Sequence, residues 1–257
     1  MRVRRNSETK GCTFLGVQYL GGKARLSAKI AAIIEAGREQ GEPLYDVFCG
    51  TANVIAACSS IGPRIAIDGC RPLIAMLSRM QAGTWSPPES VSEADHKRIK
   101  SLARRVPKPW ELADPMWAFA GFGCSFGGIW CDTFARDPKN GRNFAGTARR
   151  KLLATIERCA DVEFRCVSQI DLPELSGTVY CDPPYAGTPG YRCAPPFDGV
   201  AFWQWAERQA ERCRAVFVSE YTAPAGWREV ASWEIAAGGR VPKSGIRASR
   251  FEKLFTR

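Results

Sequence analysis

The chain has 257 residues, of which 45% are hydrophobic, so it can bury a full core as one domain with an insertion or as two small domains. Its net charge of +10 favours a polyanionic partner, and no apolar run approaches the ~20 residues that a membrane span requires. With His96 as the only histidine, the sequence disfavours His/Cys zinc sites and histidine bases, and we expect no metal.

Helix-like and strand-like segments alternate along most of the chain. Apolar residues at helical spacing predict a helix over 26–37, which Gly41-Glu42-Pro43 ends. Further helices are predicted at 51–60, 71–82, 148–159 and 199–213. Strands are predicted at 44–48, 64–67 and 162–167, in a run into Asp182, and at 215–219, 228–235 and 250–255. This alternation predicts an α/β fold built on a mostly parallel, doubly wound sheet.

Residues 85–160 interrupt the alternation and differ in composition. They hold four of the eight tryptophans, together with several glycines and prolines. We therefore predict a small inserted, mainly helical domain at 85–160, with 1–84 and 161–257 forming the main domain. Most aromatic rings of 117–130 are expected to form the core of that insertion. His96 lies among charged residues, which predicts a solvated helix face for it.

The cysteines have the distribution of small core residues. There are eleven, none in a C-x-x-C pair, and several lie in apolar segments. An odd number without a signal peptide indicates a reducing, cytoplasmic location and no disulfide framework. Cys181 is accordingly expected to pack inside its strand and not to act as a nucleophile.

The most informative motif is Asp182-Pro183-Pro184-Tyr185, which follows the apolar run 179–181. The two prolines must end a strand, and they hold Asp182 extended at its carboxyl end, where open α/β sheets bind ligands. The Asp182 carboxylate and the Pro183 carbonyl can accept both hydrogens of an aromatic amino group. The Tyr185 ring offers a face on which a planar base can stack. An ordinary strand that ends in a proline turn is the alternative.

Two further segments are typical of a nucleotide site. The strand at 44–48 leads through Phe48-Cys49-Gly50 into a turn, and Asp68 ends the next strand at a distance suited to accepting ribose hydroxyls. Neither a G-x-G-x-x-G nor a Gly-Lys-Ser/Thr phosphate loop is present, which favours a nucleoside without phosphates. Upstream, two glycines in Tyr19-Leu20-Gly21-Gly22-Lys23 let the backbone approach a ligand.

Together these segments resemble the Dam-type DNA adenine methyltransferases, over roughly residues 14–255. The order is Tyr19–Lys23, then Asp46–Gly50, Asp68, a long insertion, and Asp182–Tyr185. The insertion, with Gly123-Cys124-Ser125-Phe126-Gly127-Gly128, is similar to that of members encoded by phages and prophages. The resemblance implies a Rossmann-like class I methyltransferase fold. It also implies transfer of a methyl group from S-adenosylmethionine to N6 of an adenine that is flipped out of double-stranded DNA.

The resemblance also implies residue roles. The catalytic residues are expected to be Asp182, Pro183, Pro184 and Tyr185. The cofactor residues are expected to be Tyr19, Gly22, Lys23, Asp46, Phe48, Cys49, Gly50, Asp68, Asp171 and Asp182. DNA contacts are expected from Arg136, Lys139, Arg142, Arg149 and Arg150. We expect a monomer from a prokaryote or a phage, with an open choice among restriction-modification, phage self-protection and regulation.

Two departures from the family pattern and three alternatives stand beside this interpretation. Thr51 and Ala52 replace glycines of the cofactor turn, and Gln18 replaces a lysine that often contacts DNA. The alternatives are an RNA or protein amide methyltransferase of the same fold, a catalytically idle DNA-binding homologue, and an enzyme for a small-molecule nucleotide cofactor. The recognition sequence and the residues that read it cannot be named from these motifs.

Overall fold

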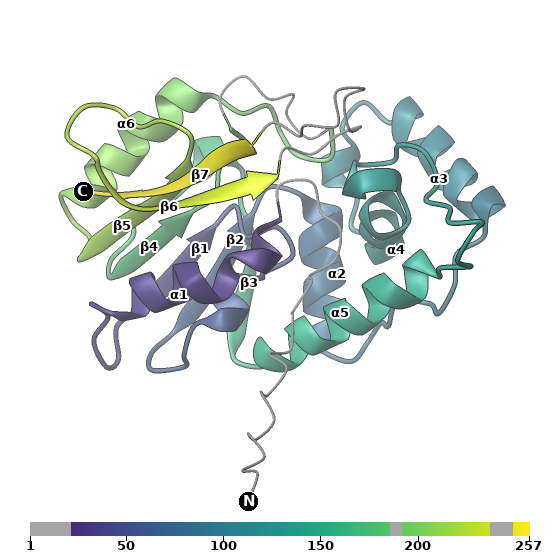
Figure 1. Ribbon diagram of the computed structural model, residues 1–257, viewed down its shortest axis with the longest axis horizontal. Helices are drawn as coiled ribbons and strands as arrows, with labels where there is room; N and C mark the ends of the chain where they lie inside the picture. Colours follow the sequence, from purple (N-terminus) through teal and green to yellow (C-terminus); the bar gives the residue numbers. More distant parts are fainter. Residues whose placement is uncertain (1–21, 186–191, 237–248) are drawn as a thin grey trace, which may run out of the picture.

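A single seven-stranded sheet organises the computed structural model, which describes residues 22–185, 192–236 and 249–257 (Figure 1). The strands are β1 Leu44–Val47, β2 Arg64–Asp68, β3 Val162–Cys166, β4 Thr178–Cys181, β5 Ala215–Glu220, β6 Arg228–Ala236 and β7 Ser249–Thr256. Their order is β3-β2-β1-β4-β5-β7-β6. Strands β1 to β5 pair in parallel, and β7 pairs antiparallel with both β5 and β6.

Helices cover both faces of this sheet, as the prediction of a doubly wound α/β fold requires. The α-helices are α1 Ser27–Glu35, α2 Arg71–Gln81, α3 Glu93–Arg105, α4 Pro115–Ala118, α5 Phe144–Arg158 and α6 Gly199–Ala210. Alternate residues of β4 point to opposite faces. Val179 and Cys181 pack with α6, whereas Tyr180 belongs to the cluster that contains α1, α2 and α5. The predicted fold class is therefore confirmed.

The chain reverses its strand order between β1 and β4. Strand β1 pairs with β2 on one side and with β4 on the other, so the connections leave in opposite directions. The crevice outside the carboxyl ends of such strands is where α/β sheets bind ligands. The fold thus brings the ends of β1, β2 and β4 to one edge of the sheet.

The segment 85–160 forms helices of its own but shares a core with the sheet. Phe119, Phe122 and Trp130 belong to the same buried cluster as the side chains of α1 and α2. Phe122 and Trp130 are buried as predicted, whereas Phe126 is 66% exposed on a turn at Gly127. The domain boundaries at 84/85 and 160/161 stay a prediction.

Two predictions about local structure are wrong. The expected helix at 51–60 is reduced to a single 3₁₀ turn, η2 (Ile55–Ala57), because Phe48, Gly50 and Ala52 all have left-handed backbone, with φ between 53° and 64°. His96 is buried and not solvated, because it shares the inward face of α3 with Ile99. Its Nε2 lies 2.9 Å from the hydroxyl of Ser125.

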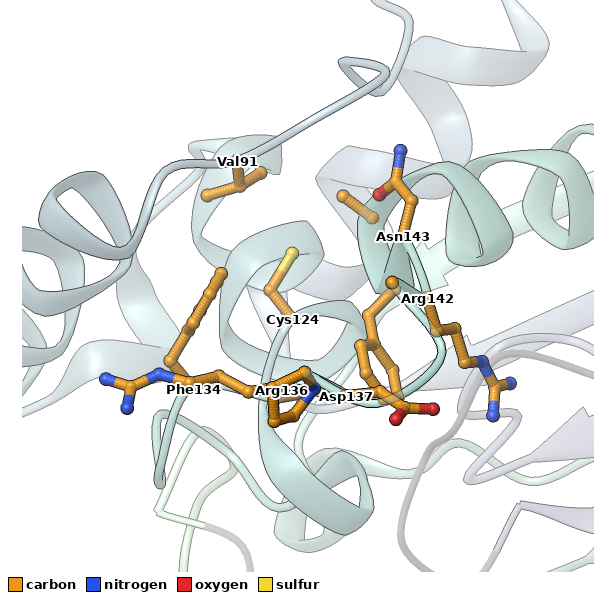
Figure 2. Close-up of a pocket in the computed structure, with 12 residues that line it drawn as sticks. Val91, Cys124, Phe134, Arg136, Asp137, Arg142 and Asn143 are labelled. Atoms are coloured by element: carbon orange, nitrogen blue, oxygen red, sulfur yellow. The ribbon is translucent and has the colours of Figure 1, made fainter.

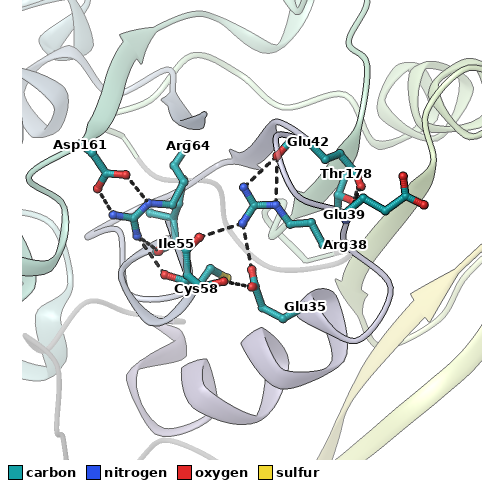
Figure 3. A network of polar contacts seen from close by, with 10 residues as sticks. Glu35, Arg38, Glu39, Glu42, Ile55, Cys58, Arg64, Asp161 and Thr178 are labelled. Carbon is teal, nitrogen blue, oxygen red and sulfur yellow. Dashed lines mark hydrogen bonds and ion pairs between the residues drawn. The ribbon is translucent and has the colours of Figure 1, made fainter. Parts of the chain in front are cut away.

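Two buried arginines close the amino edge of the sheet, opposite the ligand-binding edge (Figure 3). Arg64 donates to the backbone carbonyls of Ile55, Cys58 and Arg158 at 2.9 to 3.0 Å, and pairs with the Asp161 carboxylate. Arg38 donates in the same way to Ser59 and Glu42 carbonyls and to the Glu35 carboxylate. These bonds satisfy loop carbonyls that would otherwise be buried without donors.

Candidate functional site

Four side chains from distant parts of the chain meet at the carboxyl end of β4. Lys23 comes from the 3₁₀ helix η1 (Lys23–Arg25), Asp182 and Tyr185 follow β4, and Glu252 comes from β7. The Lys23 Nζ lies 2.5 Å from Asp182 Oδ1 and 2.7 Å from Glu252 Oε1. It also donates to the Tyr185 hydroxyl at 2.5 Å, and that hydroxyl donates to Glu252 Oε1 at 2.6 Å. These four residues are called the Lys23 cluster below.

The sequence explains why Asp182 ends up in this cluster. Its backbone N–H still donates to the Val47 carbonyl at 3.1 Å, so the residue continues the sheet one step beyond β4. Pro183 and Pro184 have no N–H to donate, so pairing with neighbouring strands stops there. The Tyr185 ring then packs edge-on against Tyr221 with 4.7 Å between centroids, after β5. Asp182 therefore lies at the carboxyl end of β4, as the sequence predicts, while the roles of Asp182 and Tyr185 stay predictions.

Burial sets the electrostatics of the Lys23 cluster. Burial raises the pKa of Asp182 to about 6, against the lowering effect of Lys23 and with a further rise from Glu252. Burial lowers the pKa of Lys23, but Asp182 and Glu252 outweigh it and the net shift is upward. Burial and the two carboxylates also raise the pKa of Tyr185, so its hydroxyl stays a neutral donor. Water screens these charges little, because the Lys23 side chain is 4% exposed.

The ends of β1 and β2 supply two more buried carboxylates. Asp68 Oδ2 accepts from the Gly50 N–H at 3.0 Å and its Oδ1 from the Cys70 N–H at 2.8 Å, so it fixes the turn after β1. Asp46 Oδ2 accepts from the Ile55 N–H at 3.2 Å. Burial raises the pKa of both carboxyl groups. Asp46 Oδ1 is buried without a hydrogen-bond partner in the described structure.

The turn between these acids holds the other predicted cofactor residues of the first half. The Phe48 ring lies edge-on to Phe197 and Phe202, 5.7 Å from each. Cys49 is buried, and burial raises the pKa of its thiol well above the ordinary value, so it is a poor nucleophile. The left-handed backbone of Phe48 costs about 1–2 kcal/mol compared with a regular conformation.

The remaining predicted cofactor residues are less closely tied to the cluster. Gly22 is exposed and directly precedes η1, which starts at Lys23. Asp171 is exposed in the 3₁₀ helix η6 (Gln169–Asp171), which follows β3. Tyr19 lies outside the described residues. The structure therefore brings together Lys23, Asp182 and Tyr185, while the cofactor roles of all the predicted residues stay predictions.

The predicted DNA-contacting residues lie on and around the start of α5. Arg136, Lys139, Arg142 and Arg150 are exposed. Arg149 is instead held against the preceding loop, where it pairs with Glu89 at 2.7 Å and donates to Ser86 at 2.9 Å. Arg136 and Arg142 flank a pocket of about 330 Å³ whose wall includes Phe134, Cys124 and Asn143 (Figure 2). Contact with a polymer stays a prediction for all five basic residues.

Glu252 is the residue that sequence reasoning missed. It is the one acid among the last twenty residues of the sequence, which hold six lysines and arginines, so its neighbours along the chain suggest only a basic surface. A recognisable signal existed, because Glu252 and the fully buried Leu254 lie two positions apart on one face of β7. An acid on the inward face of a strand needs a partner, and here the partners are Lys23 and Tyr185.

The strand order β3-β2-β1-β4-β5-β7-β6, with β7 antiparallel, is the Rossmann-like class I fold of S-adenosylmethionine-dependent methyltransferases, as the sequence predicts.

Within the described residues, no helix has the length and apolar character that crossing a bilayer demands. The cysteines of this part of the chain are free thiols, and Cys181 is fully buried as expected.

Comparison with known proteins adds distant structural likenesses. The sequence matches no protein-family model and no curated protein. The structure is similar to protein 1320 of Thermoplasma acidophilum, at 13% identity and a TM-score of 0.42 over 91% of this chain and 88% of that one. It is similar to a precorrin-6y C5,15-methyltransferase from Geobacter metallireducens, at 10% identity and a TM-score of 0.40 over 95% and 93% of the two chains. The rRNA methyltransferase aviRa from Streptomyces viridochromogenes gives 15% identity and a TM-score of 0.37 over 90% and 83%. Likenesses this distant leave the activity and the substrate of this chain open.

Proposed function

We propose that this chain is an S-adenosylmethionine-dependent methyltransferase that modifies the N6 amino group of adenine in DNA. The observation that carries the proposal is the position of Asp182. Its carboxylate stands at the carboxyl end of β4, beside a tyrosine ring, and Lys23 Nζ donates to it at 2.5 Å. The Asp182 carboxylate thus already accepts a hydrogen bond from a nitrogen donor, the ammonium group of Lys23. The amino group of a base is a nitrogen donor of similar size.

The residues at the carboxyl ends of β1 and β2 fit the proposed cofactor. S-adenosylmethionine carries a cationic sulfonium, a methionine ammonium group and ribose hydroxyls, all of which bind carboxylates. Asp46 Oδ1 is a buried acceptor that has no donor among the described residues, and a ligand N–H or O–H would satisfy it. Asp68 lies at the end of β2, where α/β folds hold ribose hydroxyls. Lys23 would remain in the cofactor pocket, paired with Glu252.

The chemistry asked of the protein is positioning. When bound, S-adenosylmethionine would supply an electrophilic sulfonium methyl group, with a neutral thioether as the leaving group. Asp182 and the Pro183 carbonyl accept the two amino hydrogens, which directs the nitrogen lone pair out of the aromatic ring. Tyr185 stacks on the base, and Asp182 accepts the proton that the methylated nitrogen releases. Orientation and fixed charges of this kind account for much of enzymatic rate enhancement.

The proposed polymer substrate rests on charge and on the basic insertion. The net charge of the chain is +10, which favours a polyanionic substrate. Arg136, Lys139 and Arg142 are exposed next to one another along the chain, as phosphate contacts would be. A protein amide would gain nothing from these residues, whereas RNA phosphates fit them as well as DNA phosphates do. RNA is therefore the second substrate to test.

One assay tests both the reaction and the polymer. The purified chain is incubated with methyl-labelled S-adenosylmethionine and, in parallel, with plasmid DNA, total RNA and a protein mixture. Label in DNA as N6-methyladenine is expected, and sequencing of the treated plasmid then maps the sites. Asp182→Ala should abolish the label while circular dichroism shows a folded chain. Label that appears only in RNA would move the function to the RNA alternative, and near-normal activity of Asp182→Ala would overturn the proposed mechanism.

A further inference from the structure

The charges of the Lys23 cluster do not balance. Asp182 and Glu252 are carboxylates, and Lys23 is the one ammonium group that the described residues place between them, so the formal sum of these three with all ionised is −1. The side chains of Lys23, Asp182 and Glu252 are 4%, 18% and 7% exposed. Charges this deeply buried act on a ligand with little screening by water or salt.

Glu252 is the source of the imbalance. Without its charge, Lys23 and Asp182 would form a neutral pair. Glu252 reaches the cluster from β7, the antiparallel strand, and its Oε1 accepts both from Lys23 at 2.7 Å and from the Tyr185 hydroxyl at 2.6 Å. A glutamine amide oxygen could accept the same two bonds. The negative charge is therefore the one property of this position that the amide cannot replace.

A second observation is a buried acceptor near the cluster that has no donor among the described residues. Asp46 lies near enough to Asp182 and Lys23 for their charges to act on it, and its Oδ1 is buried without a donor. Among the described residues, the carboxyl edge of the sheet thus has a buried acceptor without a donor beside a cluster whose charges do not balance. A cation with donor groups is the ligand chemistry that completes it.

We propose that Glu252 is a specificity-determining residue whose charge makes the site bind cationic S-adenosylmethionine in preference to the neutral product S-adenosylhomocysteine. The inference rests on the proposed function, because it concerns the same cofactor. The two molecules differ in one methyl group and one unit of charge. A site with a surplus negative charge distinguishes them by that charge, and loss of the charge on methyl transfer favours release of the product.

Calorimetric titration of the full chain tests this proposal. Three ligands are used: S-adenosylmethionine, S-adenosylhomocysteine and sinefungin, in which an amine-bearing carbon replaces the methylated sulfonium and restores the positive charge. The variants are Glu252→Gln and, as a matched control, Glu234→Gln, the same change at an exposed position on neighbouring β6. Lys23→Gln changes the charge of the cluster in the opposite direction. Thermal melting confirms that each variant is folded before titration.

The expected results differ in sign between the variants. Glu252→Gln should weaken S-adenosylmethionine and sinefungin about tenfold and change S-adenosylhomocysteine less than about threefold. Glu234→Gln should leave all three affinities unchanged, and Lys23→Gln should raise the preference for the cationic ligands. Equal changes for all three ligands in Glu252→Gln would overturn the proposal and would leave the proposed function intact. Failure of the unmodified chain to bind any of the three would instead overturn the proposed function, and the inference with it.

Discussion

Replacing the proposed catalytic acid by its amide should make the protein more stable. In the folded chain Asp182 shares one ammonium group with Glu252, and burial raises its pKa to about 6. The free energy needed to ionise Asp182 is therefore higher in the folded state than in the unfolded state. Asp182→Asn keeps an oxygen that can accept from Lys23 but removes the charge. We expect the variant to lose methyl transfer and to gain stability. Active-site residues are often retained for activity at the expense of stability.

The size of the gain follows from the pKa. A carboxyl group with a raised pKa in the folded state contributes stability that is complete below its ordinary pKa of 3.8 and is lost as the pH rises through about 6. The amide does not titrate, so the advantage of Asp182→Asn grows with pH. At 1.36 kcal/mol per pKa unit, it should rise from less than about 1 kcal/mol at pH 4 to about 3 kcal/mol above pH 7. In a chain of this size that is a rise in melting temperature on the order of 6–10 °C.

Urea unfolding followed by tryptophan fluorescence measures this difference at pH 5, 6, 7 and 8 without cofactor. The free energies of unfolding of the two proteins should diverge between pH 5 and 7 and then run parallel. Asp171→Asn is the matched control, because Asp171 is an exposed carboxylate next to the same edge of the sheet, and its effect should be small. A gain in stability for Asp182→Asn that is independent of pH, or a loss at pH 8, would contradict the reasoning. Either result would show that ionised Asp182 does not destabilise the folded state.

The remaining predictions concern activity and the opposite edge of the sheet. Because methyl transfer needs ionised Asp182, kcat/KM should fall about tenfold per pH unit below about 6, and a flat pH profile down to pH 5 would contradict this role. Tyr185→Phe keeps the ring but removes the donor to Glu252, so it should retain more methyl transfer than Tyr185→Ala, while urea unfolding shows a loss of about 1–2 kcal/mol. Equal activity in the two variants would argue against stacking. Arg64→Met leaves three backbone carbonyls without their donor, so unfolding should become easier by about 3 kcal/mol or more while the rate of the folded enzyme at 15 °C stays unchanged. A slowed rate with unchanged stability would place Arg64 in the active site instead.

An element of this fold could be predicted from the sequence where the pattern that specifies it lies within a few neighbouring residues. Apolar runs and their spacing gave the strands and most of the helices, because a buried strand or an amphipathic helix carries its pattern within a few residues. The helix expected at 51–60 failed because the carboxylate of Asp46, from another element, captures the Ile55 N–H, and because left-handed residues bend the chain before it. His96 was misplaced because its charged neighbours along the chain hide a buried stripe with Ile99 and Ala103.

The candidate site was predictable in part for the same reason. Asp182, Pro183 and Tyr185 are adjacent in sequence, so their motif could be recognised without a structure. The contact between Lys23 and Tyr185 spans 162 positions, and that between Tyr185 and Glu252 spans 67. The family resemblance placed Lys23 in the same pocket as Asp182, but neither it nor any local pattern indicated that Glu252 would meet the motif. Only the antiparallel pairing of β7 with β5 and β6 places Glu252 there.

The two edges of the sheet differ in how their buried charged groups are satisfied, and this difference supports the proposed site independently of any motif. At the amino edge, Arg38 and Arg64 direct their donors to loop carbonyls and carboxylates. At the carboxyl edge, Asp46 has an oxygen without a donor, Asp182 is ionised at a cost, and Phe48 has left-handed backbone. Trp227 has the other buried group without a partner in the described residues. Costs of this kind are typical of positions kept for a ligand, so the group formed by Asp46, Asp182 and Phe48 favours the carboxyl edge as the place to test for binding.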